Sequence, residues 1–290
     1  MGPVIVPLDE SALAEEAVGW AAVMARAQGR PMHLVSVQPP ADAFWEFADV
    51  DPRVPIQAHR ETLQAYLDQL RRLDVLKGIP VSVDVLDGRI VPQLQWLVDR
   101  TEAALVVITT RGRSGFRPGS IGSVADKLVR TLAVPVVVVP PGAPFVPIDA
   151  ILVPLDGSDQ AALALPGARE LALGLGATVH LLRAIDPDIA WGLPDEEGAR
   201  FLAEARKRAE CDLATVAAPG EVAAVREGRA PEVILDYAGE NGCRLIAMAT
   251  HGRSEQLRLE LGSVADAIVR DTDRPVMLMR VQPADTSDIQ

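Results

Sequence analysis

Two short segments of this chain combine residue types that are suited to holding an anion. Each reads Gly-Ser-Val-Ala-Asp, once at 122–126 and again at 262–266. A glycine allows a ligand to approach the backbone closely, and the first turn of a helix offers free N–H groups and the positive end of the helix dipole. A serine with an acid three positions later is typical of a capping box. We predict that Ser123 and Ser263 are N-caps and that a phosphate fits in front of each helix.

Acidic and polar residues stand where two predicted strands end. Val-Pro-Leu-Asp closes an apolar run at Asp9 and again at Asp156. A later apolar run leads into Thr-Arg-Gly-Arg-Ser from Thr110 and into Thr-His-Gly-Arg-Ser from Thr250. In an open parallel sheet, ligands bind in the crevice at the carboxyl ends of the strands, where the strand order reverses. The aspartates and the helix starts are expected to meet there, although each aspartate taken singly also suits a turn or cap.

The chain is an internal duplication. Segment 4–11 matches 151–158 at a separation of 147 residues, and 122–126 matches 262–266 at a separation of 140. Motif order is the same in both copies, and nine residues separate the glycines at 112 and 122 as well as those at 252 and 262. Such self-similarity indicates two supersecondary units of one kind. Ligand binding by at least one copy is therefore the favoured interpretation.

Chain length also predicts two domains, because 290 residues are about two domain lengths. We expect domain 1 at 1–142, domain 2 at 148–281 and a flexible tail at 282–290. Residues 140–147 include four prolines and predict an extended linker. The first copy is longer by seven residues, and we place them in the Pro-, Trp- and Phe-bearing stretch 39–55, interpreted as a loop or lid.

Short apolar runs alternate with helical patterns in each copy. Runs such as 105–108 and 136–139 are apolar throughout, which is typical of strands covered on both faces. The expected fold is α/β: two tandem, doubly wound, Rossmann-like sheets of five parallel strands in the order 3-2-1-4-5. The expected strands are 4–8, 31–37, 81–86, 104–109, 135–139, 150–155, 177–184, 221–226, 244–249 and 275–280. The expected helices are 11–28, 56–76, 90–102, 123–132, 159–175, 195–216, 230–241 and 263–272. Each fifth strand would be an apolar edge, so we expect the copies to pair through these edges as a pseudo-two-fold dimer.

Charge and hydropathy exclude several classes of partner. Forty acidic residues against 28 basic ones give a formal charge of −12, which disfavours nucleic acid and anionic membrane surfaces. No apolar stretch is long enough to span a bilayer, and no leader pattern precedes Val4, so we expect a cytoplasmic protein. The two cysteines, Cys211 and Cys243, lack C-x-x-C spacing and are expected to be buried or half-buried packing residues.

The strand-1 Val-Pro-Leu-Asp, the polar loop after strand 4, the nine-residue gap and the Gly-Ser-Val-Ala-Asp together resemble the universal stress protein family, over nearly the whole chain and twice. In nucleotide-binding members of that family, ATP lies in the crevice, with the aspartate on the ribose, a strand-2 backbone group on adenine, and the glycine motif with its serine on ribose and phosphates. The resemblance implies the following binding residues in the two copies: Asp9, Val37, Gly112, Gly122, Ser123 and Val124, and Asp156, Ala184, Gly252, Gly262, Ser263 and Val264. It implies ATP, with or without magnesium, as the ligand.

Both copies depart from the family motif. Its first glycine is Thr109 in copy one and Ala249 in copy two. A methyl group is tolerated against a ligand more easily than a branched hydroxyl side chain, which favours copy two. The loop of copy two also holds Glu255 and Glu260, which would repel a triphosphate unless they point away or bind a metal.

Three functions remain open at this point. The leading hypothesis is a stress-response regulatory protein that binds ATP or ADP without dedicated catalytic machinery, so that occupancy shifts a conformation or a partner interface. A slow ATPase or nucleotidyl-transfer enzyme is disfavoured, because there is no Gly-x4-Gly-Lys-[Ser/Thr] loop and none of the three lysines lies in the predicted phosphate loop. The third is a ligand-free interaction protein with degenerate pockets. We expect a homo-oligomer on top of the internal pseudo-dimer.

Overall fold

The structure is a computed structural model, and it describes residues 2–38, 40, 53–110, 121–250 and 261–280. Both loops after strand 4 and the C-terminal tail lie outside the described residues. So does most of the stretch that we interpreted as a lid.

Strands and helices alternate in copy one, as the apolar runs predict. Its elements are β1 (Val4–Pro7), α1 (Ala12–Gln28), β2 (Met32–Gln38), α2 (Arg53–Leu70), the 3-10 helix η2 (Asp74–Leu76), β3 (Val81–Asp87), α3 (Ile90–Thr101), β4 (Leu105–Thr109), α4 (Ser123–Thr131) and β5 (Val136–Val139). Residues 140–149 then connect the copies without a helix or strand. Phe145 of this linker packs edge-to-face on Trp20 of α1, with ring centroids 5.4 Å apart.

Copy two repeats the pattern. Its elements are β6 (Ala150–Pro154), α5 (Asp159–Ala162), α6 (Ala164–Leu175), β7 (Thr178–Ile185), the 3-10 helix η3 (Pro187–Ala190), α7 (Asp195–Val216), β8 (Val222–Glu227), α8 (Ala230–Glu240), β9 (Leu245–Ala249), α9 (Ser263–Asp271) and β10 (Val276–Met279).

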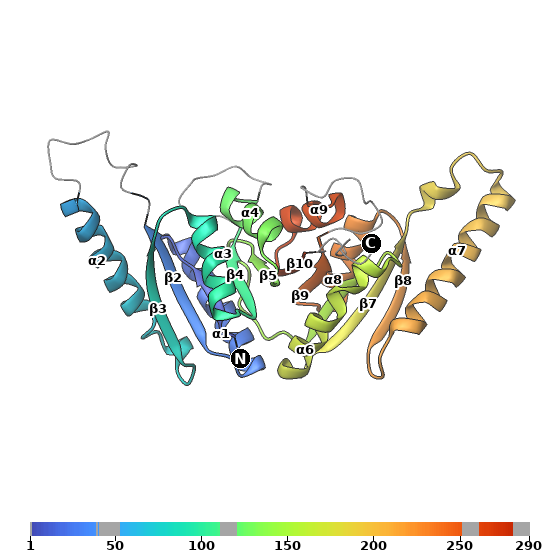
Figure 1. Cartoon of the computed structure of the whole chain (residues 1–290). Helices are drawn as coiled ribbons and strands as arrows, with labels where there is room; N and C mark the ends of the chain where they lie inside the picture. The colour runs from blue at the N-terminus through green and yellow to red at the C-terminus, as the bar shows by residue number, and fades with distance from the viewer. Residues whose placement is uncertain (1, 39, 41–52, 111–120, 251–260, 281–290) are drawn as a thin grey trace, which may run out of the picture.

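The ten strands form one sheet. Their order is β3-β2-β1-β4-β5-β10-β9-β6-β7-β8, so each half has the predicted order 3-2-1-4-5. Pairing is parallel within each half and antiparallel between β5 and β10, where Val136 lies opposite Leu278 and Val138 opposite Val276. The predicted pairing of the fifth strands is confirmed, and the two copies are related by a pseudo-two-fold axis at the centre of the sheet (Figure 1).

Helices cover both faces of this sheet. Helices α1, α2, α6 and α7 bury side chains against one face, and α3, α4, α8 and α9 against the other. Every residue of β4, β5, β9 and β10 is buried, which is why those runs carry no polar alternation. The core on the first face continues across the junction of the two copies. Among the described helices, none is long and apolar enough to cross a membrane.

Two predicted helices are interrupted. The expected helix 159–175 divides at Leu163 into α5 and α6. Pro166 has no N–H to donate to the carbonyl of Ala162, so the ladder cannot run through this point. The expected helix 56–76 ends at Leu70 and is followed by η2. Cys243 is buried as expected, but the expectation for Cys211 is wrong, because that residue is exposed on α7.

The extra length of copy one lies mainly elsewhere than we predicted. α2 ends at Leu70 and β3 begins at Val81, whereas α7 ends at Val216 and β8 begins at Val222. That connection is therefore twice as long in copy one, and η2 fills it. Leu76 of η2 is buried in the core, so this part of the insertion extends the packed structure.

Candidate functional site

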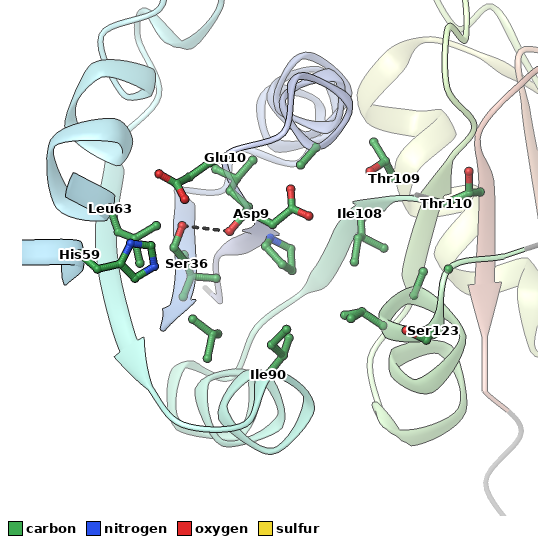
Figure 2. Close-up of a pocket in the computed structure, with 18 residues that line it drawn as sticks. Asp9, Glu10, Ser36, His59, Leu63, Ile90, Ile108, Thr109, Thr110 and Ser123 are labelled. Carbon is green, nitrogen blue, oxygen red and sulfur yellow. Dashed lines mark hydrogen bonds between the residues drawn. The ribbon is translucent and has the colours of Figure 1, made fainter. Parts of the chain in front are cut away.

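A cavity of about 410 Å³ opens at the carboxyl ends of the strands of copy one. It lies between β1, β2, β4 and the start of α4, which is where the switch point of this topology places a ligand crevice. Figure 2 shows Asp9 at the middle of the cavity, Ser123 at one end, and His59 and Leu63 at the other. Of the six residues expected to bind in this copy, the cavity is lined by five: Asp9, Val37, Gly122, Ser123 and Val124.

Copy two has a cavity of about 310 Å³ in the equivalent place. Again five of the six expected residues line it: Asp156, Ala184, Gly262, Ser263 and Val264. Gly112 and Gly252 lie outside the described residues, as do Glu255 and Glu260. The substituted first glycines, Thr109 and Ala249, each line the cavity of their own copy.

The strand-1 aspartates are held in the same way in both copies. Asp9 Oδ1 accepts hydrogen bonds from Ser11 N at 3.1 Å and Ser11 Oγ at 2.6 Å. Asp156 Oδ1 accepts from Ser158 N at 2.9 Å and Ser158 Oγ at 2.5 Å. Each serine is in turn the N-cap of the next helix and accepts a bond from the amide three residues later. One carboxylate oxygen therefore orders a helix start, which fixes the carboxyl group at the cavity.

The predicted capping boxes are not formed. The N-cap of α4 is Gly122 and not Ser123, and the N-cap of α9 is Gly262 and not Ser263. The physical reason lies in the glycine amides. Gly122 N donates to Thr110 O at 2.6 Å, and Gly262 N donates to Thr250 O at 2.8 Å, which ties each helix start to the end of its strand. Each serine is therefore the first helical residue and is exposed at the cavity, so its hydroxyl is not used as a cap.

The helix starts present backbone amides at the cavities, and anion binding there stays a prediction. Ser123 and the residues after it present amides of the first helical turn, which have no partner inside a helix. Asp126 in that turn forms an ion pair with Arg130, with Oδ1 2.7 Å from Arg130 Nη2. No lysine or arginine is among the described residues that line either cavity. Helix dipoles and amides are accordingly the described positive features of both sites.

Sequence reasoning missed the residues that distinguish the two cavities. Glu10, His59, Leu63 and Ile90 line the cavity of copy one. Copy two has Ala230 where copy one has Ile90, and among its described lining residues none comes from α7. No motif marks His59, because its position depends on how α2 packs on the sheet.

The two repeated histidines serve the core rather than the site. His33 is buried on β2, with Nε2 at 3.0 Å from Asp84 Oδ2. His180 on β7 lies with Nδ1 at 3.1 Å from the hydroxyl of Tyr237 on α8. Burial lowers the pKa of both imidazoles below the ordinary value, and Asp84 opposes this only in part at His33. Both are therefore neutral packing residues near pH 7.

Comparison with known proteins assigns the chain to a family. The model of the universal stress protein family matches residues 1–140 and again residues 147–280. The chain belongs to the universal stress protein family. As a tandem universal stress protein, it is 27% identical to universal stress protein Rv1996 of Mycobacterium tuberculosis, over 96% of this chain and 95% of that one. It is also 34% identical to a universal stress protein of Thermus aquaticus, over 45% of this chain and 97% of that protein.

Solved structures agree on the fold of this tandem universal stress protein. A universal stress protein from Archaeoglobus fulgidus superposes with a TM-score of 0.70 at 19% identity, covering 96% of this chain and 98% of that one. A protein of unknown function from Pseudomonas aeruginosa, PA1789, superposes with a TM-score of 0.69 at 16% identity, covering 97% and 92%. The α/β architecture with two sheet halves is thus shared over the full length.

Proposed function

We propose that this tandem universal stress protein binds an adenine nucleotide in each copy and acts as a stress-response regulator without dedicated catalytic machinery. The phosphates lie at the start of α4 and of α9, the ribose lies on Asp9 or Asp156, and the base lies toward Val37 or Ala184. Occupancy then changes a conformation or a partner interface.

The observation that carries this proposal is that an aspartate and a helix start without a side-chain cap line one cavity, in both copies. Asp9 and Ser123 line one cavity of about 410 Å³, with Asp9 at its middle and Ser123 at one end in Figure 2. Asp156 and Ser263 line the equivalent cavity of about 310 Å³. Small-molecule sites are usually clefts of this volume range, apolar in most of their lining and with a few placed polar groups. A nucleotide matches that lining, because it has an apolar ring at one end and an anion at the other.

The described lining residues of the two cavities include few ionisable side chains. In copy two, Asp156 is the one ionisable side chain among them, and in copy one they are Asp9, Glu10 and His59. Phosphoryl transfer relies on cationic groups placed around the transferred phosphate. No lysine or arginine is among the described lining residues, and the loops 111–120 and 251–260, which hold arginines, lie outside the part of the chain that the structure describes.

Thermal unfolding tests the proposal. We expect ATP with magnesium to raise the melting temperature, because a ligand at 100 times its Kd adds about 2.7 kcal/mol of stability. The matched control is the double variant Ser123→Glu, Ser263→Glu. Both serines are exposed first residues of their helices, so a carboxylate there keeps the helix but repels phosphate.

Three outcomes separate the functions. A shift in the native chain that the double variant loses supports the proposal. No shift with ATP, ADP or AMP overturns it and leaves the ligand-free interaction protein. Steady phosphate release that Asp156→Ala abolishes would instead show an enzyme.

A further inference from the structure

The two cavities differ most at the end away from the phosphate site. In copy one, Figure 2 places His59 and Leu63 of α2 at that end, opposite Ser123. The described lining of the copy-two cavity has no residue from the corresponding helix α7. The cavity of copy one is also larger, about 410 against 310 Å³. Helix α2 therefore adds a wall that the second cavity lacks.

Matching ion pairs show which residues of α2 and α7 are equivalent. Arg60 Nη1 lies 2.6 Å from Asp87 Oδ2 at the end of β3, and Arg206 Nη2 lies 2.9 Å from Glu227 Oε1 at the end of β8. Each helix also ends the same number of residues after its arginine, at Leu70 in α2 and at Val216 in α7. With Arg60 matched to Arg206, His59 corresponds to an alanine.

Alanines occupy both wall positions of copy two. Ala205 stands where copy one has His59, and Ala209 stands where it has Leu63. Leu63 and Ala209 are each 3% exposed, which confirms that the two helices present the same face to the sheet. The difference is thus one of side-chain size and not of helix orientation.

We propose that copy one has a purine subsite, formed by His59 and Leu63, and that copy two lacks it, so that only copy one selects its ligand by the base. This inference rests on the proposed function. It adds that the two pockets of one chain differ in specificity. The phosphate end is built alike in both copies, from Gly122 and Ser123 or from Gly262 and Ser263.

The physical basis is contact with the flat base. The half-buried imidazole of His59 offers an aromatic ring, and Leu63, although 3% exposed, adds an apolar edge to the cavity lining. Stacking of a base on an aromatic side chain contributes enough to affinity to be measured by alanine substitution. A two-ring purine covers more of such a wall than a pyrimidine. In copy two, Ala205 and Ala209 leave the base without a wall from α7 among the described lining residues.

Binding of ATP and UTP to chains with one blocked pocket tests the subsite. Ser263→Glu leaves copy one available, and Ser123→Glu leaves copy two. By titration calorimetry, we expect copy one to prefer ATP over UTP by up to about tenfold, because the larger purine gains only part of what a whole stacking contact contributes. Copy two is expected to bind both nucleotides with nearly equal affinity.

Substitution at the wall itself provides the second arm. In the Ser263→Glu background, His59→Ala is expected to remove most of the preference for ATP, whereas His59→Phe, which keeps an aromatic face, retains it. The reciprocal change, Ala205→His in the Ser123→Glu background, is expected to create a preference for ATP in copy two. Adding Ala209→Leu should strengthen it, and Ala205→His alone serves if the larger residue disturbs folding.

The outcomes distinguish this inference from the proposed function. If both nucleotides bind and the ratio of their affinities is the same in the two copies, the purine subsite is wrong while nucleotide binding stands. An unchanged ratio in His59→Ala has the same meaning. If neither nucleotide binds the native chain, the proposed function itself fails, and the subsite fails with it.

Discussion

Glu10 and Gly157 are equivalent residues in equivalent backbone conformations, and only one of them suits its conformation. Each follows the strand-1 aspartate, with φ of 65° at Glu10 and 80° at Gly157. Glycine adopts the left-handed region without penalty, whereas a residue with a side chain is disfavoured there. Copy one therefore holds local backbone strain beside Asp9 that copy two avoids.

We predict that Glu10→Gly raises the free energy of unfolding by up to about 1 kcal/mol, because relief of the left-handed penalty exceeds the added freedom of the unfolded chain. Gly157→Ala is the matched control and should lower it, since φ of 80° is unfavourable for a residue with a Cβ. Urea unfolding of the ligand-free chain measures both. The interpretation is wrong if the two substitutions change stability in the same direction.

His33, which is buried, and His180, which is half-buried, predict how stability depends on pH. Burial keeps the folded-state pKa of His33 and His180 below the ordinary value near 6.5. As the pH falls below 6.5, the unfolded chain binds protons that the folded chain does not, so the free energy of unfolding decreases. Well above that pH, the histidines are neutral in both the folded and the unfolded chain, and the slope disappears.

Replacing both histidines with glutamine should flatten this dependence between pH 5 and 6.5. Urea unfolding at several pH values provides the measurement, with the native chain as reference. An equally steep loss of stability in the double variant would assign the effect to other groups.

Much of the site at this scale was predictable from residue type and spacing, and some was not. The strand-1 aspartates and the Gly-Ser pairs were placed at the cavity by the repeat and the switch-point rule. The prediction that Ser123 and Ser263 are N-caps was wrong. In copy one, a hydrogen bond from Gly122 N to Thr110 O decides where α4 starts. His59 could not be found, because burial of Leu63 and Leu67 sets the rotation of α2 and no local pattern reports it.

At the scale of elements, the two copies use different residues to hold the connection between the long outer helix and the third strand. Arg169 of α6 donates to both carboxylate oxygens of Glu221, at 2.7 and 2.8 Å, and to Val216 O at the end of α7. In copy one, Arg26 of α1 donates instead to the carbonyls of Val75 and Lys77 around η2. Each arginine fixes the connection between the long outer helix and the third strand.

We predict that Arg169→Met lowers the free energy of unfolding by about 2 kcal/mol at pH 7, because it leaves the nearly buried carboxylate of Glu221 without its charged partner. Arg169 holds the pKa of Glu221 below its ordinary value. The native pair therefore stabilises the fold above the unfolded pKa near 4.3, and that contribution is lost as the pH falls through the lowered folded pKa.

The difference between Arg169→Met and the native chain should accordingly shrink at low pH. Urea unfolding at pH 7 and at pH 3.5 tests this. A difference of the same size at both values would mean that packing of the arginine stem, and not its charge, supports the connection.

Element order and type followed from the sequence because apolar runs and helical patterns alternate cleanly. The ends of elements did not follow from the sequence where a tertiary contact, or a proline without a backbone N–H, decides where a helix stops. Pro166 divides the predicted helix 159–175, and Leu76 draws η2 into the core after α2 ends. The seven extra residues were counted correctly, but their place depended on that packing.

At the scale of the whole molecule, α1 and α6 meet across the pseudo-two-fold axis without room for another atom. A Cβ at Gly174 would lie 2.0 Å from Ala27 O. Arg30 and Glu170 form an ion pair at 2.9 Å beside this contact. The two copies are therefore joined by a close helix crossing as well as by the pairing of β5 with β10.

We predict that Gly174→Ala lowers the free energy of unfolding by about 1–3 kcal/mol, since backbone must move to admit the methyl group. Gly239→Ala is the control: it lies within α8, nothing lies within 4 Å of its Cβ position, and the change should stabilise the chain by up to about 1 kcal/mol. Guanidinium unfolding measures both. Equal effects of the two substitutions would contradict a close crossing at Gly174.

Twist reconciles antiparallel pairing at the centre with the positions of the two sites. Strands rotate by about 20° from one to the next, so opposite directions at β5 and β10 turn toward a common direction farther out. In Figure 1, the ends of β2 and β7 and the helices α4 and α9 all lie at the upper end of the molecule. Both cavities consequently open toward one end.

Pairing of β5 with β10 within one chain, rather than between two, changes what a single substitution can do. In a symmetric dimer of identical subunits, every substitution appears twice, and the two pockets can never differ. Here the junction is covalently continuous through residues 140–149, and each codon alters one pocket only. Every molecule therefore carries one pocket with the α2 wall and one without it. The one-to-one ratio of the two kinds of pocket does not depend on expression level or on exchange of subunits.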